Sequence, residues 1–365
     1  MALAPAVDPA TLDDVVRAAV GVSGARVTSW SVSALPSGMG NPTTSGLARY
    51  TGLAECDGVE LPWSAVRKDL RLPQEPPGLA APRHPVYWRR EVAAYDSGFL
   101  VDLPGGVVAP RPLHVDDSGA DTATLWLEDV GRMDRPWGES SRRAAILHLA
   151  RFHAAYLTGT PIPGYPWMGL HVARQWLDAL RPVAERGLAA VRGTSRALAP
   201  LVTLLDDPAP ALQALESAPQ TLCHHDPNPD NLLVRSADGD TQLVAIDWQM
   251  MGRGPIGEDI AQFLSGLMGS APSEDREHLE SAALAAYHRA LMAAGVPISL
   301  GEVHRGYYCA GALRQGVFAF FLLGEQLQEA RTGESSRAVV EGFVRRTRHG
   351  HLPALAARAR MLTAG

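Results

Sequence analysis

The sequence predicts an α+β protein in which a small antiparallel β-sheet region is followed by a larger helical region. Between residues 25 and 70, apolar and β-branched residues recur in short segments bounded by Gly and Pro, a pattern typical of antiparallel strands. From about Arg142 the pattern changes to amphipathic helices. The helical part is interrupted at 221–248, where two apolar segments flank a turn around Asp238-Gly239 and predict a hairpin.

The first region begins with a helix expected at 10–20, whose acidic residues lie near its start, where the helix dipole favours them. The expected strands cover 25–35, 46–56, 59–70, 107–115 and 122–128. A linker at 36–45 joins the first two strands, a Pro-rich loop covers 72–85, and a helix is expected at 87–99. We therefore expect residues 1–125 to form a small, β-rich lobe.

A connector at 126–131 leads to the second region, which spans residues 132–365. Its first helix covers 141–157, where Ile146 and Leu149 are among the apolar positions of one face. Further helices are expected at 169–193, 196–216, 257–269, 274–294, 301–330 and 335–362. The patterns contain no internal repeat and no low-complexity tract, so the sequence predicts two lobes of different secondary structure.

Composition is that of an ordinary globular protein and excludes several functional classes. Of the 365 residues, 46% are hydrophobic and 20% charged, which allows a sizeable core. The formal net charge of −6 argues against a nucleic-acid-binding surface. The N-terminal segment lacks the pattern of a signal peptide, and the longest apolar run, 317–323, is far shorter than a membrane span. With three scattered cysteines and no CxxC pair, we expect a cytoplasmic protein with neither nucleic-acid nor membrane partners, whose oligomeric state stays open.

Three polar residues of the 221–248 segment form a pattern suited to phosphoryl transfer. Asp226 and Asn231 belong to the motif His224-x-Asp-x4-Asn, and Asp247 ends the second apolar run. Phosphoryl transfer requires positioning, charge neutralisation by magnesium and a carboxylate that orients the attacking hydroxyl. Asn231 and Asp247 can supply the oxygen ligands that Mg²⁺ prefers, and Asp226 can face the substrate. The alternative is a polar turn, since Asp, Asn and Pro are common in turns, but the strands around the motif favour the catalytic interpretation.

Two residues near this motif are expected to support it rather than to react. We expect His224 to be a buried histidine whose hydrogen bond holds the loop. Asp259 is expected to be structural, with a carboxylate that accepts hydrogen bonds from the loop backbone. A zinc site formed by His224, His225 and Asp226 is disfavoured, because no further ligands follow at a suitable spacing.

Lys68 is the single lysine of the chain, whereas the other 32 basic residues are arginines, as 33 basic residues are present in all. It ends a segment with strand character, and a strand lysine that faces a cleft can pair with the α- and β-phosphates of a nucleotide. Such a lysine needs a carboxylate to fix it, and Glu91 in the following helix is the best candidate. The alternative is an edge-strand lysine and an unrelated surface glutamate.

These residues resemble, in order and spacing, those of the aminoglycoside phosphotransferase and choline kinase-like family of small-molecule kinases. The matching positions are Lys68, Glu91, His224-x-Asp226-x4-Asn231 and Ile246-Asp247-Trp248. The resemblance extends roughly from Val27 to Phe343 and implies the bilobal protein-kinase-like fold. By that resemblance, 1–125 is the nucleotide-binding lobe, 126–131 is the hinge, and 132–365 is the helical lobe with the catalytic hairpin and the acceptor-binding helices.

The resemblance also implies a role for each residue of the set. Asp226 is then the catalytic base, and Asn231 and Asp247 are the magnesium ligands. Lys68 contacts the triphosphate of ATP and pairs with Glu91. The enzyme would transfer the γ-phosphate of ATP, with Mg²⁺, to a hydroxyl group of a small molecule.

Two further segments are implied to contact the nucleotide. Residues 127–130 correspond to the hinge, with Glu128 and Val130 as the contacts of the adenine base. The phosphate-loop position falls at 37–41, with the expected contacts Ser37, Gly38 and Gly40. This segment lacks a full GxGxxG pattern, so 43–45 can share its role.

Three departures or open points concern the acceptor. His225 stands where the family often has glycine, and its side chain either points into the acceptor pocket or is simply tolerated. Trp248 and Gln249 follow Asp247, as expected for small-molecule kinases rather than protein kinases. The segment 161–176 falls where the family builds its acceptor lobe, with four candidate lining residues, Tyr165, Trp167, His171 and Trp176.

By resemblance, an aminoglycoside-like antibiotic is the first expectation for the acceptor. The alternative within the same class is a metabolite kinase that acts on an amino sugar, a choline-like alcohol or a homoserine-like alcohol. An alternative of another class is a pseudokinase that binds a nucleotide without turnover. The pseudokinase is disfavoured because no member of the Lys, Glu, Asp, Asn, Asp set is missing.

Overall fold

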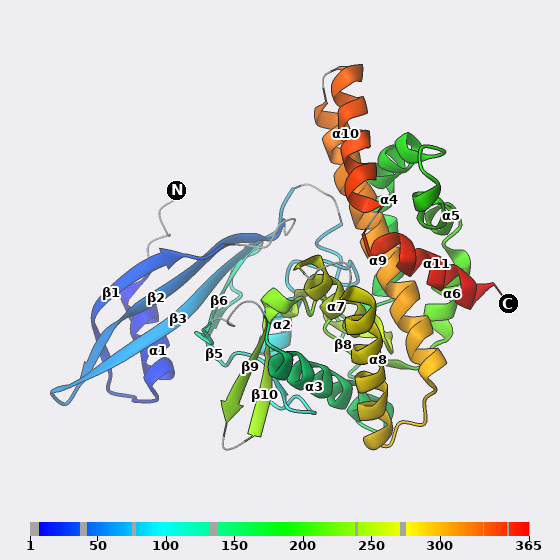
Figure 1. The fold of residues 1–365 in the computed structure, drawn as a ribbon. Helices are drawn as coiled ribbons and strands as arrows, with labels where there is room; N and C mark the ends of the chain where they lie inside the picture. The colour runs from blue at the N-terminus through cyan, green and yellow to red at the C-terminus, as the bar shows by residue number, and fades with distance from the viewer. Residues whose placement is uncertain are drawn as a thin grey trace.

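The computed structural model has the predicted α+β architecture, with an antiparallel sheet region and a helical region (Figure 1). It describes residues 7–36, 42–74, 78–131, 137–237, 240–270, 275–330, 332–348 and 350–364. Among these residues, none of the helices combines the length and the apolar character needed to cross a membrane.

The N-terminal sheet has five strands in the order β1-β2-β3-β6-β5, and every neighbouring pair is antiparallel. Its strands are β1 (Arg26–Ala34), β2 (Thr44–Cys56), β3 (Val59–Arg71), β5 (Pro112–Asp116) and β6 (Thr122–Glu128). The turn between β2 and β3 consists of Asp57 and Gly58, which both have positive φ, at 52° and 78°. Two-residue hairpin turns of this kind match the twist of the strands, and Asp and Gly adopt them readily.

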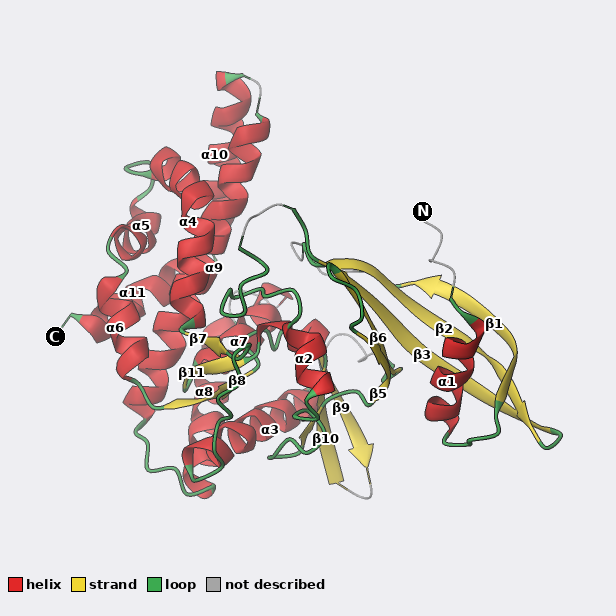
Figure 2. Cartoon of the chain, turned by 180° about the vertical axis from the view of Figure 1, so that it is seen from behind, coloured by secondary structure: helices red, strands yellow, loops and turns green. Residues whose placement is uncertain are grey.

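One face of the sheet is covered by α1 (Pro9–Val20) (Figure 2). The α1 helix packs on Trp63 and Ala65 of β3, which belong to a core separate from that of the helical region. Because successive side chains of a strand point to opposite faces, Lys68 lies on the side away from α1. The short helix α2 (Arg90–Asp96) lies between this sheet and the helical region (Figure 2). It carries Glu91, which contacts Lys68.

The helical region is organised around a long helix, α9, which packs on α4, α6, α7 and α11. Its elements are α3 (Glu139–Leu157), α4 (Val172–Val191), α5 (Ala199–Asp206), α6 (Ala209–Ser217), α7 (Glu258–Ser270), α8 (Arg276–Ala293), α9 (Leu300–Glu329), α10 (Gly333–Thr347) and α11 (Leu352–Thr363). The close approach of α4 and α9 depends on Gly324, since a Cβ there would lie 2.2 Å from the carbonyl oxygen of Val183. The end of α9 and α10 project together beyond the other helices (Figure 1).

Two small sheets shape the loops between these helices. One contains β4 (Val107–Val108), β10 (Asp240–Ala245) and β9 (Leu232–Ala237), and the other contains β7 (Gly169–Leu170), β11 (Gly252–Pro255) and β8 (Gln220–Cys223). The β9 and β10 strands pair antiparallel, which confirms the expected hairpin, although its turn residues Asp238 and Gly239 lie outside the described residues. The first strand of the 221–248 segment, β8, pairs instead with β11.

The expected elements were too long in four places, and proline or glycine marks most of the breaks. The 107–115 strand is two pieces, since Pro110 separates β4 from β5, and β4 joins the distant β10 rather than the N-terminal sheet. The 196–216 helix breaks before Pro208, and the 335–362 helix breaks near Gly350. The 87–99 helix is limited to α2, and Gly98, whose φ is positive at 71°, follows its C-terminal end.

Candidate active site

Asp226 lies in the loop between β8 and β9, where side-chain amides hold its carboxylate. Its Oδ1 accepts a hydrogen bond of 2.7 Å from Nδ2 of Asn228, and its Oδ2 accepts one of 3.0 Å from Nδ2 of Asn231. The same Asn231 nitrogen donates to the Asp226 carbonyl at 2.9 Å. Since the nitrogen of the Asn231 amide is engaged with Asp226, its oxygen is the atom that can serve a cation.

The backbone of this loop is held by Asp259, at the start of α7. The fully buried Asp259 carboxylate accepts hydrogen bonds of 2.8 Å from the backbone N–H groups of His224 and His225. It also lies 3.0 Å from Nε2 of His153. Burial opposes the charge, but the hydrogen bond with His153 and nearby histidines hold the pKa of Asp259 well below its usual range. The expected structural role of Asp259 is confirmed.

His224 also holds the loop, as expected from the sequence. Its Nε2 lies 3.0 Å from the Ile246 carbonyl oxygen, and its Nδ1 accepts a hydrogen bond of 3.2 Å from the backbone N–H of Asp226. Burial lowers the pKa of His224 and favours the neutral ring. A neutral ring with both nitrogens engaged in the protein is a structural group and not an acid or base.

The β9–β10 hairpin brings Asn231 and Asp247 together at one end. Leu232 pairs with Ala245 at the end of the ladder, and the backbone N–H of Ile246 donates to the Asn231 carbonyl at 2.9 Å. Asp247 follows with φ of 63°, a left-handed conformation that is uncommon for a residue other than glycine. Such conformations persist where the surrounding structure imposes them, and here the conformation accompanies a contact with Lys68.

Lys68 joins the N-terminal sheet to this hairpin through two carboxylates. Its Nζ lies 2.6 Å from Oε2 of Glu91 and 2.9 Å from Oδ1 of Asp247. The expected pairing of Lys68 with Glu91 is confirmed, and the edge-strand alternative is wrong, because β3 lies between β2 and β6 and the Lys68 side chain is only 8% exposed. The other oxygen of Glu91 accepts a hydrogen bond of 3.2 Å from the backbone N–H of Trp248.

The charges of Lys68, Glu91 and Asp247 lie close together and shift the pKa values within this group. Burial opposes the charge of Lys68, but the Asp247 and Glu91 carboxylates outweigh burial and raise the pKa of the ammonium group. Burial would likewise raise the pKa of Asp247, but the Lys68 ammonium lowers it below its ordinary value. At neutral pH the lysine is therefore charged and Asp247 ionised, which keeps an anionic oxygen available at the end of the hairpin.

Asp226 differs from Asp247 in its ionisation. Burial raises the pKa of Asp226 to about 6, and the neighbouring Asp247 charge adds to the effect. Arg314 and the two asparagine amides act in the opposite direction. The carboxylate is thus largely ionised at neutral pH, and it holds a proton more readily than an ordinary aspartate.

The expected nucleotide contacts are only partly placed by the structure. Glu128 ends β6, and its carboxylate accepts hydrogen bonds of 3.1 Å from Nη1 of Arg235 and from the backbone N–H of Arg111. Val130 lies two residues after Glu128. The expected contacts of Glu128 and Val130 with the adenine base stay a prediction. The Ser37, Gly38 and Gly40 positions lie outside the described residues. Among the alternatives, Thr43 is buried and accepts a hydrogen bond of 2.5 Å from Gln249, and Ser45 donates to the Asp69 carbonyl at 3.2 Å.

The aromatic residues of the 161–176 segment fall into two groups. Tyr165 and Trp167 stack at 4.7 Å, pack on the core, and are tied to α2 by a hydrogen bond of 2.7 Å from Arg90 to the Trp167 carbonyl. Trp176 lies elsewhere, on α4, under the guanidinium of Arg314 with 5.3 Å from its carbon to the ring centroid. His171 is largely exposed, with 63% of its side chain accessible.

Arg314 is a member of the site that was not predicted from the sequence. It lies on α9, and Nη2 of its guanidinium is 3.8 Å from Oδ1 of Asp226. The signal in the sequence was a single arginine within the apolar stretch Ala310–Val317 of an expected helix. A buried arginine needs partners, but the sequence did not identify them.

His225 does not point into an open acceptor pocket. Its side chain is fully buried, and its Nδ1 lies 3.0 Å from Oε1 of Glu258, without hydrogen-bond alignment. The ring occupies space that Gly254 provides, because a Cβ at that glycine would lie 2.5 Å from Cε1 of His225. The histidine is therefore accommodated inside the protein by a glycine on β11.

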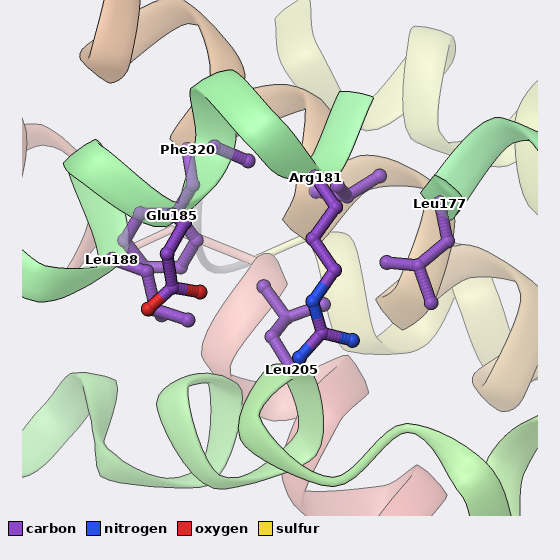
Figure 3. A pocket seen from close by; sticks show the side chains of 8 residues that line it. Leu177, Arg181, Glu185, Leu188, Leu205 and Phe320 are labelled. Carbon is purple, nitrogen blue, oxygen red and sulfur yellow. The ribbon is translucent and has the colours of Figure 1, made fainter. Parts of the chain in front are cut away.

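A small cavity between α4, α5 and α9 is unsuited to an acceptor. Arg181, Glu185 and Leu205 are among its lining residues (Figure 3). Its volume of about 10 Å³ is space for at most one water molecule. The Asp226 surroundings, where the Asp226 and Asp247 side chains are 27% and 31% exposed, are the more suitable place for chemistry on a substrate.

Comparison with known proteins places this geometry in a family. Residues 82–295, more than half of the chain, match the family model of the phosphotransferase enzyme family, a range that includes Glu91, Asp226, Asn231 and Asp247 but not Lys68. A search of curated proteins gave no significant match.

Solved structures share the fold at low sequence identity. An amicoumacin kinase in complex with AMP-PNP, Ca²⁺ and amicoumacin is 12% identical, with a TM-score of 0.53 and coverage of 87% of this chain and 89% of the other. A microcompartment-associated aminopropanol kinase is 17% identical, with a TM-score of 0.50 and coverage of 92% and 95%. The chain belongs to the phosphotransferase enzyme family and is a small-molecule kinase.

Proposed function

We propose that this chain is an ATP- and magnesium-dependent O-phosphotransferase that transfers the γ-phosphate of ATP to a hydroxyl group of a small molecule. The observation that supports it most is the convergence of Asp226, Asn231 and Asp247 on the Lys68–Glu91 pair, through the 2.9 Å contact of Lys68 with Asp247. A polar turn would not require a buried lysine from a distant sheet at this place.

Asp226 is proposed as the general base. The acceptor hydroxyl gives its proton to the Asp226 carboxylate while its oxygen attacks the γ-phosphorus of ATP. The bond from that phosphorus to the bridging oxygen breaks, and ADP leaves. Asn228 and Asn231 hold the carboxylate in one orientation through its two oxygens, which supports its role in aligning the hydroxyl.

Lys68 is proposed to contact the α- and β-phosphates, with Glu91 fixing its ammonium group. Residues 1–125 and the hinge at 126–131, with Glu128 and Val130 at adenine, would hold the nucleotide. Ser37, Gly38 and Gly40 are proposed to contact the phosphates. The 132–365 lobe would supply the catalytic loop and the acceptor-binding helices.

Asn231 and Asp247 are the residues that would hold magnesium. The Asn231 amide oxygen and the partly exposed Asp247 carboxylate form an all-oxygen donor set, which suits Mg²⁺. When bound, the ion would neutralise charge on the phosphates. The amicoumacin kinase, whose structure contains a nucleotide analogue and Ca²⁺, supports the expectation of a nucleotide with a divalent cation.

For the acceptor, we propose an aminoglycoside-like antibiotic as the first compound class to test. The second is a metabolite with an amino sugar, choline-like or homoserine-like alcohol. The two similar structures are kinases of amicoumacin and of aminopropanol, so the fold supports both classes.

The test is an ATP-consumption screen over both classes, followed by mass spectrometry of each hit. We expect a product heavier by one phosphoryl group, together with ADP. Binding of ATP and magnesium without transfer to any acceptor would favour the pseudokinase alternative instead.

A further inference from the structure

Arg90 is a fully buried cation at the start of α2, directly before Glu91. Among the described residues, no carboxylate forms an ion pair with its guanidinium. Burying a charge without an opposite charge is unfavourable, and packing alone would be satisfied by an apolar side chain of similar size. The partners of Arg90 therefore indicate what its charged group does.

The guanidinium of Arg90 makes five hydrogen bonds, as many as it has N–H groups, and all of them reach backbone carbonyls. Its Nε donates to the Trp167 carbonyl at 2.7 Å, and its Nη1 donates to the Gln249 carbonyl at 2.9 Å. Three further bonds of 2.6, 2.7 and 3.1 Å hold the loop that precedes α2, at the carbonyls of Pro85, His84 and Pro82. One planar group, whose donors have fixed directions, thus holds three separate segments of the chain.

The segments that Arg90 holds belong to different sides of the candidate site. Trp167 belongs to residues 161–176, the segment where the acceptor is expected to bind (the acceptor segment). Gln249 lies two residues after Asp247. Glu91, the next residue of α2, lies 2.6 Å from the Lys68 ammonium on the nucleotide side of the site. Arg90 therefore lies where the acceptor segment meets the nucleotide side.

Two further hydrogen bonds extend this connection from the residues after Asp247. The Gln249 side chain donates to Oγ1 of Thr43 at 2.5 Å, directly before β2 of the N-terminal sheet. The backbone N–H of Gly169, in the acceptor segment, donates to the Met251 carbonyl at 3.2 Å. The 249–251 segment is thus attached to the N-terminal sheet region on one side and to the acceptor segment on the other.

We propose that Arg90 is a positioning residue that aligns the acceptor segment with the nucleotide side of the site by holding the carbonyls of Trp167 and Gln249. This inference rests on the proposed phosphotransferase function. Alignment of the acceptor hydroxyl with the γ-phosphate determines the rate of the chemical step, and a misplacement of about 1 Å can cost about 10²-fold. The effect of Arg90 is therefore expected in kcat.

The test is the steady-state kinetics of Arg90→Lys, with varied ATP and an acceptor that the screen identifies. Lysine keeps the charge but carries its three donors on one nitrogen, so it cannot hold all five carbonyls. We expect kcat to fall about 10–100-fold while KM for ATP stays within about threefold of the wild type, because the Lys68 contacts are intact. The assay is run well below the melting temperature of each variant, so that folded enzymes are compared.

The matched control is Arg186→Lys. Arg186 also holds a backbone carbonyl, that of Gly324, together with Oε1 of Gln328, between α4 and α9. Its kcat and its KM for ATP should be those of the wild type. If Arg90→Lys does not fold, Gln249→Leu tests the same connection, since it removes the hydrogen bond to Thr43 and should also lower kcat.

A lower melting temperature of Arg90→Lys with a wild-type kcat would mean that Arg90 only stabilises the fold, and would overturn the inference. A raised KM for ATP at unchanged kcat would also overturn it, because Arg90 would then act on nucleotide binding alone. In both cases the wild type phosphorylates the acceptor, so the proposed function stands and only the assignment of Arg90 is wrong. If the wild type binds ATP and magnesium but phosphorylates no acceptor, the proposed function is wrong, and with it the inference.

Discussion

Lys68 and Asp247 are separated by 179 positions in the sequence, yet the Lys68 ammonium lies 2.9 Å from the Asp247 carboxylate. One belongs to the N-terminal sheet and the other follows the β9–β10 hairpin of the helical region. Glu91, on α2, completes the group from the other side at 2.6 Å. Lys68 thus links β3 to α2 and to the segment after β10. Substitutions in this group can therefore test both stability and catalysis.

The Lys68→Met variant should have a lower free energy of unfolding than the wild type and should lose turnover. Removing one partner of a buried ion pair typically costs about 3–5 kcal/mol, because the remaining charge is left uncompensated. Glu91 is 1% exposed, so Lys68→Met/Glu91→Gln should recover part of the lost unfolding free energy. Denaturant unfolding of the two single variants and the double variant measures this coupling.

Lys68→Arg should also impair turnover, because a planar guanidinium does not replace a compact ammonium group. The matched control is Arg67→Lys on the same strand, whose partner Asp69 lies 2.8 Å away. Steady-state kinetics with varied ATP would show a large effect for the first variant and a small one for the second. An unimpaired Lys68→Arg enzyme would mean that the identity of the lone lysine is incidental.

Phosphorylation of the acceptor should fall as the pH drops through about 6. Asp226 must be ionised to accept the proton, and its raised pKa of about 6 means that the active form is complete above this value and lost below it. Between pH 8 and pH 5 the rate should fall about tenfold, in proportion to the ionised fraction. Circular dichroism at pH 5 verifies that the fold persists, and a flat profile over this range argues against Asp226 as the base.

Asp247→Asn should lose most of its response to magnesium and only a small part of its stability. Even groups that only support metal ligands are typically worth about 10–100-fold in metal affinity, so the Mg²⁺ concentration for half-maximal activity should rise at least about tenfold. The melting temperature should fall only slightly, because the variant loses the ionic contact of Asp247 with Lys68 but Lys68 still has Glu91 as partner. Asp240→Asn, at the other end of the same hairpin, is the charge-matched control, and equal magnesium responses in both variants would contradict the metal assignment.

Asp259→Asn should destabilise the protein by about 3 kcal/mol at pH 7, because the loop N–H groups and His153 lose an ionised acceptor. The pKa of Asp259 is lowered in the folded protein, so its contribution is present above the ordinary aspartate pKa of about 4 and is lost as the pH falls further. In denaturant unfolding, the difference in the free energy of unfolding between variant and wild type should decrease below about pH 4. A difference independent of pH would mean that the carboxylate charge is not what stabilises the loop.

Much of the fold and of the polar site could be predicted from the sequence, because local patterns determine them. The strand alternation around Lys68 and the spacing of Asp226, Asn231 and Asp247 are local, and the hairpin register then brings the last two together. The Lys68–Glu91 pairing was predicted from the need of a cleft-facing lysine for a carboxylate in the following helix, and the family resemblance supported it, since no local pattern links β3 to α2.

The remaining features depend on packing between distant segments. Arg314 joins the site because α9 packs against the loop between β8 and β9, which no pattern within α9 specifies. The burial of His225 depends on the absence of a side chain at Gly254, on another strand. In the same way, the sequence pattern predicted Val107 and Val108 to belong to the N-terminal sheet, but they pair with β10 in the hairpin of the helical region.

The most direct test of the account is the turnover of Asp226→Asn on an acceptor identified in the screen. Removal of a general base typically costs about 10²–10⁴-fold in rate, and ATP binding should persist because the Lys68–Glu91–Asp247 group is intact in this variant. We predict a loss of that size together with an unchanged thermal shift in the presence of ATP and magnesium. Turnover close to that of the wild type would contradict the assignment of Asp226 as the catalytic base.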